Sequence, residues 1–112
     1  MPLGRVREHG TFRALQRNGA RGRSGPLTVI ALVDTESGAT GVRAAFAVGR
    51  RVGPAVIRNR IRRRLRAILR EIDLAPGAYL VIAGSTAATT PYEELRAHAA
   101  RAAAAAGAGG AR

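Results

Sequence analysis

Apolar runs predict three strands along this chain. Residues 27–33 form an apolar, β-branched run, residues 42–48 a second mostly apolar run, and residues 79–83 a shorter third one. Residues 34–41 are rich in turn-forming residues, so we expect the first two strands to pair as a hairpin.

The N-terminal part of the chain is more polar and more basic. We expect residues 1–9 to form an extended arm. Residues 11–18 favour a short helix, on which Phe12 and Leu15 share one face. Residues 20–26 combine glycine, serine and proline with two arginines, and we interpret them as a flexible basic loop.

A helical period runs from Ala55 to about Ile72, with Pro54 suited to the first helical position because its missing N–H has no partner there. At about 100° per residue, the apolar positions form one narrow stripe that we expect to be buried. The stripe consists of Ile57, Ile61, Leu65, Ile68 and Ile72. The far side carries Asn59, Arg63, Arg66 and Arg70.

A last helix is predicted to run to about Ala105. Its start has a capping-box pattern, in which Thr90 is the N-cap and Glu93 returns to the N–H of Thr90. Pro91 then occupies the first helical position.

The order of helix, strands, helix, strand and helix predicts an α+β fold. We expect a two-layer sandwich, with the helices packed on one face of a small sheet. A single domain is predicted over residues 1–106, followed by a low-complexity, disordered tail over residues 107–112.

The net charge of the chain narrows the range of functions that the sequence allows. The 112 residues include 19 basic residues, all of them arginine, and 7 acidic ones, for a net charge of +12. Such an excess favours an anionic partner. No apolar run is long enough to span a bilayer and the N-terminus lacks the apolar core of a signal peptide, so we expect a cytoplasmic protein that binds nucleic acid, not a membrane. The absence of cysteine excludes disulfides and thiolate metal sites.

The predicted central helix concentrates this charge. Two interpretations of its basic run remain open, a solvated helix face and a surface that contacts phosphates. Like charges four residues apart destabilise a helix, and the run contains four such pairs, which favours phosphate contact. The arginines of the run are Arg58, Arg60, Arg62, Arg63, Arg64, Arg66 and Arg70.

Asn59 is the one neutral polar residue amid these cations. Its amide offers both an acceptor and a donor. It can order neighbouring arginines, contact a base edge or a 2′-hydroxyl, bind a hydrated metal ion, or simply be solvated.

The segment Val52-Gly53-Pro54-Ala55-Val56-Ile57-Arg58-Asn59-Arg60-Ile61-Arg62-Arg63-Arg64-Leu65-Arg66 resembles the RNR signature of the bacterial ribonuclease P protein family. The resemblance extends over roughly residues 5–100. It implies an α-β-β-β-α-β-α sandwich with a left-handed β-α-β crossover, against the usual handedness. It also implies two partners, a catalytic RNA and precursor tRNA. The residues that would contact RNA or bind structural metal are Arg58, Asn59, Arg60, Arg62, Arg63 and Arg66, with Arg50 and Arg51 beside them.

The resemblance further implies a cleft that receives the single-stranded 5′ leader of precursor tRNA, lined by Phe12. An aromatic ring there can stack on a base without sequence preference; a role in the core is equally open. The chain departs from the family pattern at Gln16, where a second aromatic is common, in residues 27–31, which contain no aromatic, and at Gly84 and Ser85, where a basic residue is common.

No catalytic constellation is evident in the sequence. His9 and His98 are far apart, and the seven acidic residues are scattered, unlike the convergent carboxylates of a two-metal nuclease. We therefore expect a non-catalytic subunit of a ribonucleoprotein endoribonuclease that removes the 5′ leader, with Mg²⁺ held mainly by the RNA. The alternatives are a general RNA-binding or ribosome-associated protein of similar fold and a stand-alone metal-dependent nuclease.

Overall fold

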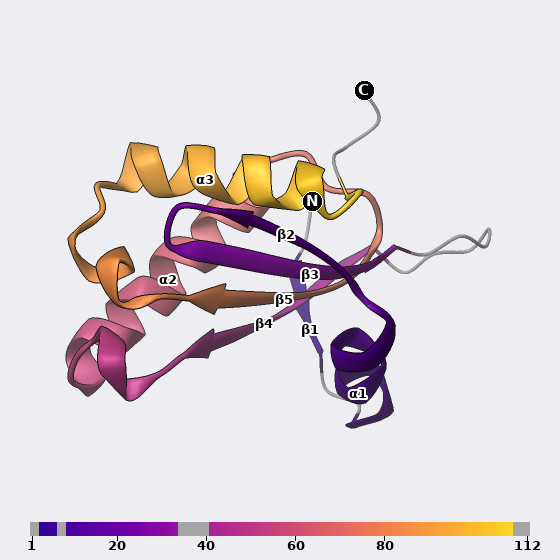
Figure 1. Cartoon of the computed structure of the whole chain (residues 1–112), viewed down its shortest axis with the longest axis horizontal. Coiled ribbons are helices and arrows are strands. Elements are labelled where there is room, and N and C mark those ends of the chain that lie inside the picture. The colour runs from indigo at the N-terminus through magenta and orange to yellow at the C-terminus, as the bar shows by residue number, and fades with distance from the viewer. Residues whose placement is uncertain (1–2, 7–8, 34–40, 109–112) are drawn as a thin grey trace.

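A mixed five-stranded sheet organises the computed structural model (Figure 1), which describes residues 3–6, 9–33 and 41–108. The strands lie in the order β1-β4-β5-β3-β2. They are β1 (Leu3–Arg5), β2 (Ala20–Ser24), β3 (Leu27–Val33), β4 (Val42–Val48) and β5 (Gly77–Ala83). The helices are α1 (His9–Asn18), α2 (Ala55–Glu71) and α3 (Tyr92–Ala105), with 3-10 turns η1 (Arg50–Val52) and η2 (Ser85–Thr89). This confirms the expected order of elements, and β1 adds a short strand within the predicted arm.

The predicted hairpin between β3 and β4 is wrong, because β5 lies between them. β5 pairs antiparallel with β3 and parallel with β4. Six of the seven residues of β5 are buried, so this strand needs cover on both faces and both edges, which only the centre of the sheet provides. Adjacency along the chain does not reveal that requirement.

The predicted flexible loop over residues 20–26 is also wrong. Residues 20–24 form β2, which pairs antiparallel with β3 through a tight turn at Gly25, whose φ is 55°. Gly22 is buried under α3, while the neighbouring Arg21 and Arg23 are exposed. The strand has no apolar side chain larger than alanine, so hydropathy alone does not reveal it.

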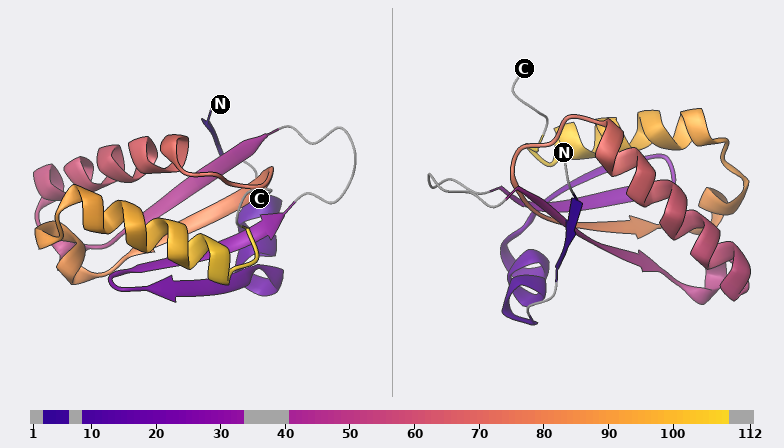
Figure 2. Two further views of the ribbon diagram at one scale, coloured as in Figure 1. Left: turned by 90° about the horizontal axis from the view of Figure 1, so that it is seen from above. Right: turned by 180° about the vertical axis from the view of Figure 1, so that it is seen from behind.

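α2 makes a left-handed crossover between the parallel strands β4 and β5. In Figure 1 both strands run toward the left, β5 lies above β4, and α2 lies behind the sheet. The view from behind in Figure 2 shows α2 in front of the same two strands. The crossover implied by the resemblance is therefore confirmed, as an exception to the usual right-handed rule.

The sheet buries a different set of side chains on each face. α2 and α3 share one face, as expected, but the prediction that all the helices pack on one face fails for α1. α1 packs against the opposite face, where Leu15 forms a smaller cluster with Ile30, Ala78 and Leu80. Only one end of that second face is covered by α1, as Figure 2 shows.

The apolar stripe of α2 anchors the helix to the sheet. Ile61, Leu65 and Ile68 are fully buried, and Ile57 and Ile72 pack against the same cluster while remaining partly exposed. The helix spans residues 55–71, within one residue of the prediction.

The ends of α3 differ from the prediction. No side chain caps its N-terminus, and the hydroxyl of Thr90 instead donates to the carbonyl of Thr86, 2.7 Å away. The capping box is therefore absent, because Thr90 terminates η2. At the other end Gly107, with φ of 75°, makes a Schellman turn, in which the N–H of Ala108 bonds the carbonyl of Ala103 at 2.9 Å. Gly107 and Ala108, which we assigned to the tail, thus belong to the helix end, and residues 109–112 lie outside the described residues.

Replacing Gly22 with alanine should destabilise the fold, since an added Cβ would lie 2.6 Å from the backbone nitrogen of Ala106. We expect the free energy of unfolding to fall by about 1–3 kcal/mol, the usual cost of overpacking, measured by urea denaturation. Gly10→Ala is the control, because nothing lies within 4 Å of its added Cβ. Equal stability of the two variants would contradict the close contact between β2 and α3.

Candidate nucleic-acid interface

The arginines of α2 form a cationic surface that no acidic side chain of the described residues neutralises. Within the described residues, none of the seven has an ion pair. Asn59, Arg60, Arg63 and Arg70 are exposed, and the other arginines are partly buried along the flanks of the helix. They include Arg66, which was predicted on the far side but reaches the Phe46 ring of the sheet. We call these seven side chains the arginine surface of α2: Arg58, Arg60, Arg62, Arg63, Arg64, Arg66 and Arg70. It projects from the helix because the opposite stripe is fixed in the core.

Three side chains of this surface are held by neighbours other than acids. Arg58 Nε donates to the carbonyl of Gly53 at 3.1 Å. Arg62 donates to Oδ1 of Asn59 at 2.9 Å. The Arg66 guanidinium lies 5.3 Å from the centroid of the Phe46 ring on β4, a cation–π contact. These contacts orient guanidinium groups while leaving their positive charge uncompensated.

The hydrogen bond from Arg62 bears on the roles left open for Asn59. It favours the first of them, the ordering of a neighbouring arginine. No group of three or more histidine, cysteine or acidic residues that could hold a metal ion occurs in the described ranges. A bound cation needs several oxygen ligands, but the neighbours of Asn59 on every side are arginines. The protein alone therefore does not offer a cation site at Asn59.

Glu71, the single acid of α2, is bound to α3. Tyr92 donates its hydroxyl to Oε2 of Glu71 at 3.0 Å, and Arg96 Nε lies 3.0 Å from Oε1. Burial, reinforced by the hydrogen bond to this carboxylate, raises the pKa of Tyr92 above its ordinary value of 10.0. The carboxylate of α2 itself is thereby engaged by α3.

Arg50 and Arg51 lie on η1, just before α2, and both are exposed. They line a hollow at the end of the sheet together with Arg62 of α2. Predicted residues from two separate segments are thus brought together at this end of the molecule.

Phe12 lies elsewhere, on the α1 side of the sheet. It is partly buried against the cluster of Leu15, Ile30, Ala78 and Leu80, so both of the roles left open for it, core and cleft, match its place at the border of this cluster. It is not brought together with the arginine surface of α2.

Two arginines that sequence reasoning missed lie on this same face of the sheet. Arg21 pairs with Ile30 and Arg23 with Thr28, and directly paired residues project from the same side. Both side chains are exposed. The signal for them was the alternation of arginine with small residues over positions 20–24, a period of two that is typical of a strand.

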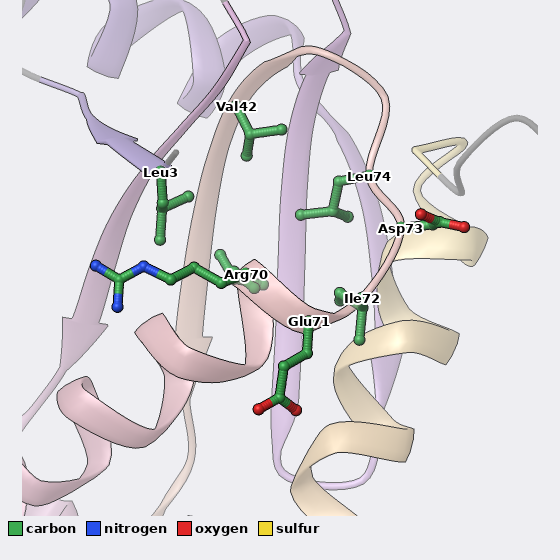
Figure 3. Close-up of a pocket in the computed structure, with 8 residues that line it drawn as sticks. Leu3, Val42, Arg70, Glu71, Ile72, Asp73 and Leu74 are labelled. Carbon is green, nitrogen blue, oxygen red and sulfur yellow. The ribbon is translucent and has the colours of Figure 1, made fainter. Parts of the chain in front are cut away.

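A second hollow lies where α2 ends near β1 (Figure 3). Arg70 extends toward Leu3, whereas the carboxylates of Glu71 and Asp73 point away from it. The charged groups therefore do not converge on one point, and Arg70 is the one member of the arginine surface of α2 that lines this hollow. No helix in the described part of the chain is long and apolar enough to cross a membrane.

The fold and the arginine surface define a small α+β protein with a left-handed crossover through a cationic helix. The sequence model of the Ribonuclease P family matches residues 3–107. The chain therefore belongs to the Ribonuclease P protein family.

Relatives agree with this assignment. The ribonuclease P protein component of Thermobifida fusca is 36% identical over 104 residues, which cover 86% of this chain and 71% of that protein. The protein of the same name from Thermus scotoductus is 44% identical over 85 residues, 74% of this chain and 49% of its own length. For that relative and for the one from Acidothermus cellulolyticus, of which 53% is covered, the match spans about half of the relative's length.

Solved structures share the fold. A mutant ribonuclease P protein of Staphylococcus aureus superposes with a TM-score of 0.80 at 19% identity, over 93% of this chain and 88% of that one. The protein from Thermotoga maritima superposes with a TM-score of 0.71 at 19% identity, over 85% and 90% of the two chains.

The raised pKa of Tyr92 predicts how the link between α2 and α3 depends on pH. A proton held more tightly in the folded state stabilises it fully below pH 10, and this contribution is lost as the pH rises through the folded-state pKa. Wild type should therefore be more stable than Tyr92→Phe near neutral pH and lose that advantage above pH 10. Urea denaturation of both proteins across this pH range measures the difference in their free energies of unfolding. Tyr79 is present in both proteins, so it does not contribute to this difference. A constant difference would contradict the assignment.

Proposed function

We propose that this chain is the protein subunit of a bacterial ribonuclease P. In this role it binds the catalytic RNA and the 5′ leader of precursor tRNA, and it assists endonucleolytic removal of the leader. The observation that carries the proposal is the arginine surface of α2, seven guanidinium groups without an acidic partner among the described residues, on the fold of this family.

Phosphates are the anions that this surface fits. Guanidinium groups pair with phosphate oxygens in a bidentate way that ammonium groups do not match. Each neutralised phosphate releases counterions, so binding weakens steeply as salt concentration rises. We assign contacts with the catalytic RNA to Arg50 and Arg51 and to the RNR residues Arg58, Asn59, Arg60, Arg62, Arg63 and Arg66.

Hydrolysis of the phosphodiester is assigned to the RNA and to Mg²⁺ held mainly by it. The protein contributes charge instead. Catalytic RNA and precursor tRNA are both polyanions, and a cationic protein at both of them lowers their mutual repulsion. By fixing the geometry of the RNA, the protein also raises the affinity of that RNA for Mg²⁺.

The leader is assigned to the α1 side of the sheet. Phe12 offers an aromatic face beside partly exposed apolar side chains, and Arg21 and Arg23 line the far edge of the same face. Base stacking with a cationic track is the arrangement that binds single strands without sequence preference. Gln16, exposed one turn after Phe12, leaves this surface with fewer aromatic contacts than family members commonly have.

Reconstitution tests the proposal. The purified protein should lower the Mg²⁺ concentration that a bacterial ribonuclease P RNA needs to cleave precursor tRNA, and should not cleave precursor tRNA alone. The double variant Arg60→Gln/Arg63→Gln should bind this RNA more weakly, with a smaller salt dependence, because about two phosphate contacts are lost.

The matched control is Arg13→Gln/Arg17→Gln, which removes the same charge from exposed positions of α1, away from the arginine surface of α2, and should bind this RNA like wild type. Cleavage by the protein alone would favour a metal-dependent nuclease. Absence of any stimulation would favour a general RNA-binding protein. Equal loss of affinity in both double variants would mean that only net charge matters.

Changing the length of the leader distinguishes the proposed leader surface on the α1 side of the sheet from the arginine surface of α2. Shortening the leader of precursor tRNA to one or two nucleotides should weaken its binding to the holoenzyme, because the α1 side of the sheet then loses its ligand. Phe12→Ala should weaken binding of the long-leader substrate by about 5- to 100-fold, the effect of losing one stacked base, and hardly affect the short one. Equal effects on both substrates would place Phe12 in the core instead.

A further inference from the structure

The hollow at the end of the sheet combines a cationic rim with an apolar floor. It lies where β4 and β5 stop and where η1 and η2 begin. Arg50, Arg51 and Arg62 supply the rim, and no acidic residue lines the hollow. Phe46, which is partly exposed on the face that α2 covers, supplies the floor, whereas Ile82 lines the hollow from the opposite face of the sheet. A concave site with an apolar surface and guanidinium groups around it suits a flat, apolar-faced group that carries negative charge.

Two glycines, which have no side chain to fill the hollow, lie at its rim. The parallel register pairs Val48 with Ala83, so Gly49 and Gly84 follow side by side. Their backbones are nearly identical, with φ of −81° and ψ of 174° at Gly49 and φ of −82° and ψ of 174° at Gly84. These are extended conformations that any residue adopts.

Gly49 has no structural reason within the fold to be glycine. Its φ does not require one, and nothing lies within 4 Å of the Cβ that a side chain would add. At Gly84 the nearest atom is the carbonyl oxygen of Pro26 at 3.3 Å. A side chain at position 49 would therefore cost the folded protein little, but it would occupy the hollow that it lines. Close approach of a ligand accounts for glycine here.

We propose that this hollow holds one unpaired nucleotide of the catalytic RNA, with its base on Phe46 and its phosphates on the three arginines. This rests on the proposed function. An unpaired nucleotide is the occupant because only a base out of its helix presents a face to a concave apolar floor. The catalytic RNA is its source because Arg62 belongs to both the hollow and the arginine surface of α2, so one RNA spans the two.

Gly49→Val tests the hollow without changing charge. The variant should fold like wild type, with an unchanged circular dichroism spectrum and melting temperature. Its affinity for ribonuclease P RNA should fall by about 5- to 100-fold, the range expected for losing one stacked base. The salt dependence of binding should stay that of wild type, because no phosphate contact is removed. Ala104→Val, at an exposed position of α3, is the matched control and should bind normally.

Crosslinking identifies the occupant. The chain contains no cysteine, so Ser85→Cys on the rim provides a unique thiol for a photo-crosslinker. In the holoenzyme bound to precursor tRNA, it should crosslink to an unpaired nucleotide of the catalytic RNA, whereas Ala104→Cys should not. Crosslinks to the leader, to a helical part of the RNA, or to no RNA would overturn the proposal.

The two proposals fail in different ways. If wild type stimulates the catalytic RNA but Gly49→Val binds it equally well, only the hollow is wrongly assigned. If wild type neither binds nor stimulates that RNA, the proposed function itself is refuted.

Discussion

The burial of one side of α2 against β4 and β5 is the constraint on which the rest of the structure depends. Full burial of an aliphatic side chain contributes about 1.5–3 kcal/mol, and Ile61, Leu65 and Ile68 are all fully buried. Repulsion between like charges four residues apart costs only about 0.2–0.5 kcal/mol for each pair. The core therefore holds the helix in place despite its arginines, and the fold can present a concentrated positive charge that no acid in the described ranges pairs with.

The handedness of the crossover decides which surface remains open. With the observed left-handed connection, α2 joins α3 on one face, and Glu71 meets Tyr92 and Arg96. A right-handed connection between the same two strands would place α2 on the face that α1 now shares. It would cover the open sheet beside Phe12 and remove the surface that we assign to the leader. The unusual topology thus separates two surfaces that a small domain would otherwise have to merge.

Local periodicity revealed the parts of this protein that depend on one segment alone. The bounds of α2 and its buried stripe followed from spacing, and the arginine surface followed as the remainder of the same helix. The position of β5 did not, because strand order depends on which segment needs cover on both edges. β2 was missed because Gly22 is buried through backbone contact with α3, which leaves no apolar signal. Arg21 and Arg23 were missed with it, so half of the proposed leader surface was invisible from hydropathy.

A surface made only of arginines would bind any folded RNA, since phosphates carry no sequence information. Discrimination on this protein must then come from contacts that do not depend on charge. The hollow beside Gly49 and the sheet face beside Phe12 both pair an apolar floor with arginines at the edge. On the proposed function, each would accept a single-stranded element that a regular helix does not offer. The arginines would then supply affinity and the two apolar floors would supply the choice of RNA.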